Sequence, residues 1–130
     1  MWADIELAVI TGLDTRLQAG VRVTDELPDR LETKLPLVWV QAAGGADDRV
    51  TDTATVDVHV FAATRAETWD LTELVRTAMH ALAATHVPGQ KAVIDDVATD
   101  QRPALVPYGN PALRRSVATY TVATRERAAP

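Results

Sequence analysis

The chain has 130 residues, and its 13 basic and 18 acidic side chains give a formal net charge of −5 at neutral pH. This length is about that of one domain, and a hydrophobic share of 47% is typical of a folded protein rather than a disordered tail. The absence of cysteine excludes disulfides, thiolate catalysis and cysteine-based metal centres. The acidic balance argues against a surface that grips nucleic-acid phosphates.

The first third of the chain predicts a helix followed by two strands. Leu7, Ile10, Leu13 and Leu17 recur at helical spacing over residues 4–17, and Asp4 is suited to cap the helix. Val21 to Thr24 alternates like a short edge strand before Pro28. The apolar run 37–41 after Pro36 predicts a buried strand of the sheet core.

The remaining segments predict a hairpin, a second helix and two further strands. Strand alternation over 51–62 pairs with 37–41 through a polar connection at 44–49, which predicts a long antiparallel hairpin with a flexible tip over about 44–53. Thr64 and Glu67 form a capping-box pattern ahead of a helix. The predicted apolar stripe of this helix consists of Leu71, Leu74, Val75, Ala78, Met79 and Leu82.

After that helix, the prolines 103 and 107 predict a bent or broken strand pair between 92 and 111, and residues 114–124 predict a final strand. The order is α-β-β-β-α-β-β, with short links and no βαβ repetition. We therefore predict an α+β fold in one domain, 1–130, in which two main helices pack on one face of a largely antiparallel sheet. The segment 125–130 lacks a core-forming pattern and is predicted to be a loose tail.

Few residues carry catalytic chemistry. Asp57 and His59 share one face of a predicted strand and are the sole candidates for a base pair or two metal ligands, although a solvated strand face is the favoured interpretation. His80 and His86 lack the spacing of a metal motif. Ser116 is the single serine and lies outside any nucleophile-elbow sequence.

The charged clusters favour structural roles over ligand binding. The Asp47–Asp48 pair beside Arg49 lacks the alternating spacing of a calcium loop, and Asp95, Asp96 and Asp100 form the other acidic group. Gly44 and Gly45 precede a strand, where a phosphate cradle needs a helix. Arg114 and Arg115, the single adjacent basic pair, suit contact with a protein partner. We predict no enzyme, no cofactor, no metal and no membrane contact, and the acidic start at residues 1–6 predicts a chain kept in the cytoplasm where it is made.

The chain resembles the tail terminator, or tail-completion, proteins of long-tailed bacteriophages, especially those of actinobacteria. The resemblance covers nearly the whole chain. It is carried by the leading helix followed by 21–28, by 35–40 with Gly44 and Gly45, by the strand-to-helix passage 56–71, and by the closing strand 115–122.

The resemblance implies a subunit that assembles as a ring, a hexamer by family analogy, at the head-proximal end of the virion tail. Such a ring stops tube polymerisation, offers a docking surface to the head connector, and lets DNA slide through its lumen without holding it. The implied partners are other copies of the chain, the tail tube protein and the connector or stopper protein. Alternatives are another neck or head-completion protein, or a small cytoplasmic α+β enzyme or ligand-binding domain that uses Asp57 and His59. The expected contact residues are Gly44, Gly45, Asp47, Asp48, Arg49, Arg114, Arg115, Arg125 and Arg127.

Overall fold

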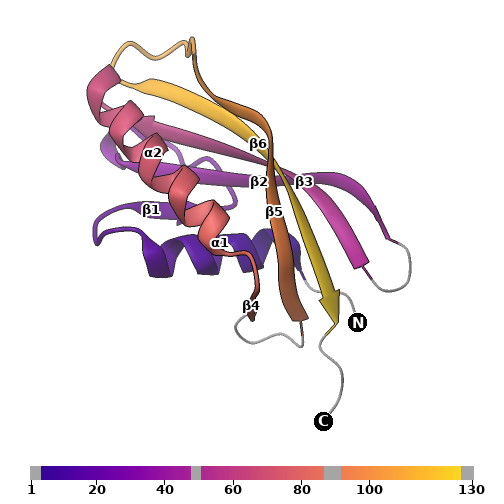
Figure 1. The fold of residues 1–130 in the computed structure, drawn as a ribbon. Coiled ribbons are helices and arrows are strands. Elements are labelled where there is room, and N and C mark those ends of the chain that lie inside the picture. The colour runs from indigo at the N-terminus through magenta and orange to yellow at the C-terminus, as the bar shows by residue number, and fades with distance from the viewer. Residues whose placement is uncertain (1–3, 48–50, 87–91, 127–130) are drawn as a thin grey trace.

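A computed structural model describes residues 4–47, 51–86 and 92–126 and shows a six-stranded sheet with two helices over one face (Figure 1). The helices are α1 (Ile5–Arg16) and α2 (Arg65–Ala81), and a 3₁₀ turn, η1, spans Leu31–Thr33. The strands are β1 (Arg22–Thr24), β2 (Leu37–Asp47), β3 (Thr51–Ala62), β4 (Thr85–His86), β5 (Ala92–Val106) and β6 (Arg114–Glu126). The α+β class and the placement of both helices on one face agree with the sequence-based prediction.

The strand order is β1-β2-β3-β6-β5-β4, so the last strand lies in the middle of the sheet. β2–β3, β3–β6, β5–β6 and β4–β5 are antiparallel, whereas β1 pairs with β2 in parallel. The sheet is therefore mixed, and the predicted order lacked the two-residue strand β4.

β5 is a single strand where the sequence predicted a bent or broken pair. The register of its pairing with β6 shifts at three places: between Ile94 and Asp96, between Thr99 and Gln101, and between Gln101 and Ala104. Pro103 lies within the last of these shifts. A proline removes one backbone donor, and an irregular position near the sheet edge tolerates that loss. The strand thus bends at its irregularities without ending.

Both helices begin at the predicted caps. The Asp4 carboxylate accepts a hydrogen bond from the Leu7 amide at 3.1 Å, and the Thr64 hydroxyl accepts one from the Glu67 amide at 3.2 Å. Neither helix in the described part of the chain has the length and apolar character to cross a membrane.

The main core lies between the helices and the sheet. α1 packs on β1 and β2, and α2 packs on β3, β5 and β6. Gly12 of α1 faces the Leu82 side chain so closely that a Cβ at this position would overlap it. The buried strand residues of this core are Val38, Val40, Val56, Val58, Val60, Ile94, Val97, Ala118, Tyr120 and Val122.

The buried faces of the two helices differ in part from the predicted stripes. α1 buries Ile5, Ala8, Val9, Gly12 and Leu13, whereas Leu7 is 51% exposed. α2 buries Thr68 and Thr72 together with the predicted Leu71, Val75, Ala78 and Met79, whereas the predicted Leu74 is 51% exposed. In both helices, the buried face includes small or polar residues that the predicted stripe left out, and it leaves out one leucine that the stripe included.

A smaller cluster lies on the sheet face without helices. Leu37 and Phe61 are paired across β2 and β3, and they pack with Leu31 of η1 and with Leu113. The indole nitrogen of Trp39 donates to the Asp25 carbonyl at 3.1 Å, which ties the segment between β1 and β2 to this face. The helix-free face is therefore partly covered near the η1 end.

Candidate assembly surfaces

Those predicted contact residues that the structure describes fall into two groups at opposite ends of the sheet. β6 runs from Arg114, paired with Ala62, to Arg125, paired with Thr51. At about 3.3 Å per residue these two arginines lie roughly 35 Å apart. The structure therefore brings Arg125 near the end of the β2–β3 hairpin and leaves Arg114 and Arg115 at the other end, so the predicted residues do not form one patch.

The hairpin end is more regular than the predicted tip. Gly44 to Asp47 belong to β2 and Thr51 to Thr53 belong to β3, with Asp47 paired to Asp52 along the backbone. A register shift between Ala43 and Gly45 marks a bulge. Asp48 and Arg49 lie outside the described residues. The flexibility of 44–53 and its role in assembly remain predictions.

The arginines of β6 are held by contacts within the chain. Arg125 forms an ion pair with Asp95 at 2.9 Å, and the Arg114 guanidinium donates to the carbonyls of Leu113 and Pro111 at 3.1 and 3.3 Å. Arg114 and Arg125 are both exposed and can still meet a partner. Arg127 and the remainder of the predicted tail, 127–130, lie outside the described residues.

Arg115 belongs to an aromatic group on the helix-free face. Its guanidinium lies 5.2 Å from the centre of the Tyr108 ring, and Tyr108 meets Phe61 edge-to-face at 5.4 Å. His59 stacks on Trp39 with ring centres 4.3 Å apart and lies 6.5 Å from Phe61. Arg115 is thus half-buried against this cluster, and its role in assembly remains a prediction.

Asp57 and His59 share a strand face, as the sequence predicted, but they form no catalytic pair. His59 is 9% exposed, and neither ring nitrogen has a hydrogen-bond partner within the described chain. Asp57 instead accepts a hydrogen bond from the Thr119 hydroxyl at 2.7 Å. Burial, aided by the nearby Arg115 and opposed by Asp57, lowers the pKa of His59 below its usual 6.5. The imidazole is held neutral in a packed site.

The other chemically suggestive residues also have structural partners. The Ser116 hydroxyl is buried and shares a 2.5 Å hydrogen bond with Thr72, and His80 bonds the Thr99 hydroxyl at 2.7 Å. Asp100 accepts from Thr121 at 2.5 Å. Across the described ranges, no group of three or more histidine and carboxylate side chains is placed to hold a metal.

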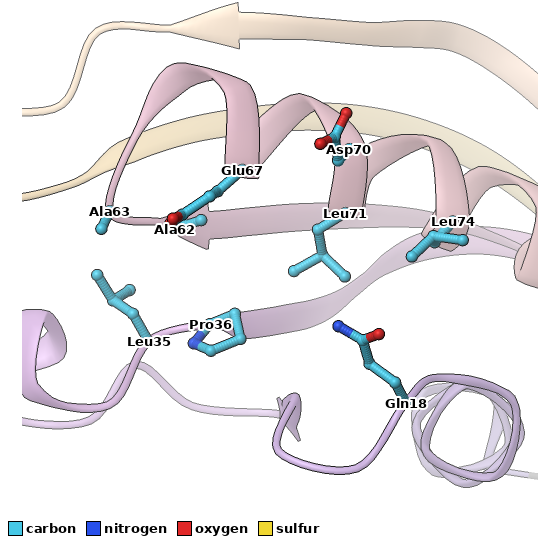
Figure 2. A pocket seen from close by; sticks show the side chains of 9 residues that line it. All are labelled: Gln18, Leu35, Pro36, Ala62, Ala63, Glu67, Asp70, Leu71 and Leu74. Atoms are coloured by element: carbon cyan, nitrogen blue, oxygen red, sulfur yellow. The ribbon is translucent and has the colours of Figure 1, made fainter.

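A groove beside α2 is the surface that the sequence reasoning missed. Figure 2 shows Leu71 and Leu74 pointing from α2 toward Pro36 and Gln18 on the opposite wall. This cavity has a volume of about 480 Å³, and a second of about 510 Å³ adjoins it at Gln18 and Leu74. We call the two together the Leu74 groove; its lining is Arg16, Leu17, Gln18, Leu35, Pro36, Ala62, Ala63, Glu67, Asp70, Leu71, Leu74, Thr77, Ala78 and Ala81.

The predicted apolar stripe of α2 is wider than one helix can bury against a sheet, and this excess width was the sign of the groove in the sequence. Leu74 lies at one flank of the predicted stripe of α2 and Met79 at the other, whereas Leu71 and Leu82 lie near its middle. A helix against a sheet covers a limited arc, so a stripe this broad leaves one flank uncovered. The exposed flank is the one that carries Leu74.

These observations define the class of the molecule: a small α+β domain with an uncovered apolar groove and exposed residues at both sheet ends. The sequence model of a family described as phage tail termination protein matches residues 1–129, so the chain belongs to this family. A comparison with curated proteins finds no match.

Membership establishes the coarse function. The chain is a structural component of the bacteriophage virion tail with a role in tail completion, and it works through contacts with other tail and head–tail components. The family is one of structural virion proteins rather than enzymes, which confirms that prediction.

Proposed function

We propose that the chain forms a ring, a hexamer, that caps the head-proximal end of the tail tube. The ring stops tube polymerisation and presents a surface to the head connector or stopper protein. Assembly takes place in the host cytoplasm, and the genome slides through the lumen without specific binding. The observation that carries this proposal is the family match over residues 1–129.

The arrangement of surfaces supports such a role. A ring needs a heterologous contact, in which two different patches of each subunit meet. The chain offers the Leu74 groove beside β1 and β2 and the open edge of β5 on the far side of the sheet. The hairpin end and the Arg114 end are available for contacts along the tail axis, to the tube and to the connector.

The test is the growth of tail tubes in the presence of the chain. Purified tail tube protein is polymerised with and without it, and tube lengths are measured by negative-stain microscopy. We expect shorter tubes with a ring-shaped density at one end. A chain that stays monomeric and neither joins tubes nor limits their growth would contradict the proposal. A ring that binds connector but never tube would favour a different neck protein.

The predicted contacts at the hairpin are tested by deletion of 47–49 in a phage that carries the altered gene. We expect loss of complete virions with normal heads and uncapped tails. A normal virion yield would show that this part of the hairpin makes no assembly contact.

A further inference from the structure

The Leu74 groove is larger and more apolar than a single exposed leucine explains. Scattered apolar residues on a surface are ordinary, but here Leu74 is 51% exposed between two adjoining cavities. The walls around it are formed by Leu35, Pro36 and Leu17, which are themselves only half-buried. The groove therefore leaves contiguous apolar surface in water unless another molecule covers it.

One end of the groove is acidic. Glu67 reaches from α2 toward Ala62, and Asp70 lies further along the helix above Leu71, with its carboxylate directed away from Pro36 (Figure 2); both side chains are exposed. Within the described residues, neither carboxylate has an ion-pair partner. Arg16 lies in the other cavity, where its guanidinium donates to the Gly12 carbonyl at 3.3 Å. A partner that is complementary to this groove therefore needs a basic side chain for the acidic end, followed by small or apolar side chains for the apolar walls.

The open edge of β5 carries such a cation. β4 pairs with β5 at Val93 and Ile94 alone, so the outer edge of β5 beyond them has no strand partner in the described part of the chain. Arg102 is exposed on this edge, followed by the exposed Ala104 and the half-buried Leu105. Unpaired edge strands are surfaces to which a second chain readily adds.

We propose that the Leu74 groove binds a second copy of this chain through the Arg102–Leu105 portion of its β5 edge. Arg102 of that copy faces Glu67 and Asp70, and its apolar neighbours cover Leu74. Because the groove lies toward β1 and β2 and the edge lies on the opposite side of the sheet, the contact is heterologous and repeats from subunit to subunit. This inference rests on the proposed ring.

Disulfide cross-linking tests the pairing directly, because the natural chain has no cysteine. The full-length double variant Leu74→Cys, Arg102→Cys is oxidised and separated on a denaturing gel. We expect a ladder of covalent oligomers that stops at the ring number. Each single variant should stay monomeric on the gel, while a mixture of the two gives a dimer. A dimer from Leu74→Cys alone would overturn the proposal, since it indicates a twofold contact.

Matched leucine variants provide a second test. Leu74 and Leu7 are equally exposed, at 51%, on the two helices. Leu74→Asp should weaken self-association about tenfold or more, because it places a carboxylate in the covered groove. Leu7→Asp should leave the association unchanged. Sedimentation velocity measures the oligomer, and circular dichroism verifies that both variants are folded. Equal association of the two variants would overturn the proposal.

Charge reversal identifies the partner residue. Arg102→Glu and the double change Glu67→Arg, Asp70→Arg should each weaken the ring, and an equal mixture of the two proteins should restore association in part. Absence of restoration would overturn the placement of Arg102.

These outcomes separate this inference from the proposed function. Wild-type rings that limit tube growth, together with a Leu74→Asp ring that is just as stable, would overturn the groove contact alone. If that variant forms rings but no longer binds tubes, the groove belongs to the tube protein and the inference is wrong. A wild-type chain that never self-associates would overturn both.

Discussion

The buried hydroxyl pair of Thr72 and Ser116 joins α2 to the central strand β6. The two oxygens are 2.5 Å apart, Ser116 is 1% exposed, and the Thr72 hydroxyl also donates to the Thr68 carbonyl at 2.6 Å. A buried hydroxyl that loses its partner costs about 1–3 kcal/mol. The single serine of the chain therefore serves stability.

We predict that Thr72→Val lowers the free energy of unfolding by about 1–3 kcal/mol, because valine keeps the volume and leaves the Ser116 hydroxyl unpaired. Urea denaturation measures this change. Glu73→Gln, at an exposed position of the same helix outside the Leu74 groove, should change stability by less than about 0.5 kcal/mol. The double variant Thr72→Val, Ser116→Ala should cost less than the sum of the single changes. Strict additivity would contradict the pairing.

His59 gives the subunit a dependence of stability on pH. Burial and Arg115 lower its pKa in the folded chain below the 6.5 of the unfolded chain, against the smaller opposing effect of Asp57. The unfolded chain therefore binds more protons in this range, and folding stability is lost as the pH falls below about 6.5. The stability from the neutral imidazole is fully present above that pH.

We predict that His59→Phe, which preserves the stacking on Trp39, flattens the fall in unfolding free energy between about pH 7 and about pH 5. Urea titrations across this range measure the slope. The control is His86→Gln, which removes an exposed histidine of β4, and its slope is compared with that of His59→Phe. Equal slopes for wild type and His59→Phe would show that another group causes the acid sensitivity.

At the scale of elements, two adjacent glycines of β2 differ in the space around them: a side chain fits at Gly44 but not at Gly45. A Cβ at Gly45 would overlap the backbone carbonyl of Thr53 on the paired strand, whereas a Cβ at Gly44 meets nothing within 4 Å. Gly45 follows the bulge in the β2–β3 register. A close approach of two backbones, rather than flexibility, explains the glycine there.

We predict that Gly45→Ala destabilises the subunit by about 1–3 kcal/mol, since the backbone that it meets cannot rotate away as a side chain can. Gly44→Ala should change stability by less than about 0.5 kcal/mol. Chemical denaturation compares the two, and amide chemical shifts of Thr53 and Ala54 locate the disturbance. If the variants are equally stable, the close approach at Gly45 does not constrain the hairpin.

The helices show which local features a sequence specifies. Asp4 and Thr64 cap them as predicted, because capping depends on residues three positions apart. Their buried faces depend on the partner surface. α1 turns Ala8 and Gly12 inward because its close approach to Leu82 requires small residues, and a pattern of large apolar residues selects Leu7 instead.

At the scale of the whole molecule, most strands could be predicted from the sequence, but β4 and the order of the strands in the sheet could not. Alternation over 51–62 and the Thr-, Val- and Tyr-rich composition of 114–124 are local features, and they identified β3 and β6. The position of β6 between β3 and β5, and the parallel pairing of β1, depend on contacts between residues far apart in the chain. The Leu74 groove also depends on contacts between distant parts of the chain, because its walls come from α1, the segment before β2, the end of β3 and α2.

The charge of the whole subunit bears on how the genome passes the tail. The chain carries 13 basic and 18 acidic residues, and several cations are already engaged: Arg125 by Asp95, Arg115 by Tyr108 and Arg16 by Gly12. Duplex DNA is bound nonspecifically through phosphate contacts that release counterions, so a chain of net negative charge is expected to bind it weakly. This weak binding is what the proposed passage of DNA through the ring requires.

We predict no saturable binding of the wild-type chain to a labelled 30-base-pair duplex up to about 10⁻⁴ M protein at about 0.15 M salt, in a fluorescence anisotropy titration. The variant Asp96→Lys, Asp100→Lys, which replaces two acidic side chains on β5 with basic ones, should bind measurably at low salt and lose affinity as salt rises. This variant is the positive control, because it shows that the assay can detect DNA binding by this fold when basic side chains are added. Micromolar binding of the wild type, with an affinity that falls steeply with salt, would contradict passive passage and indicate that the subunit grips the genome.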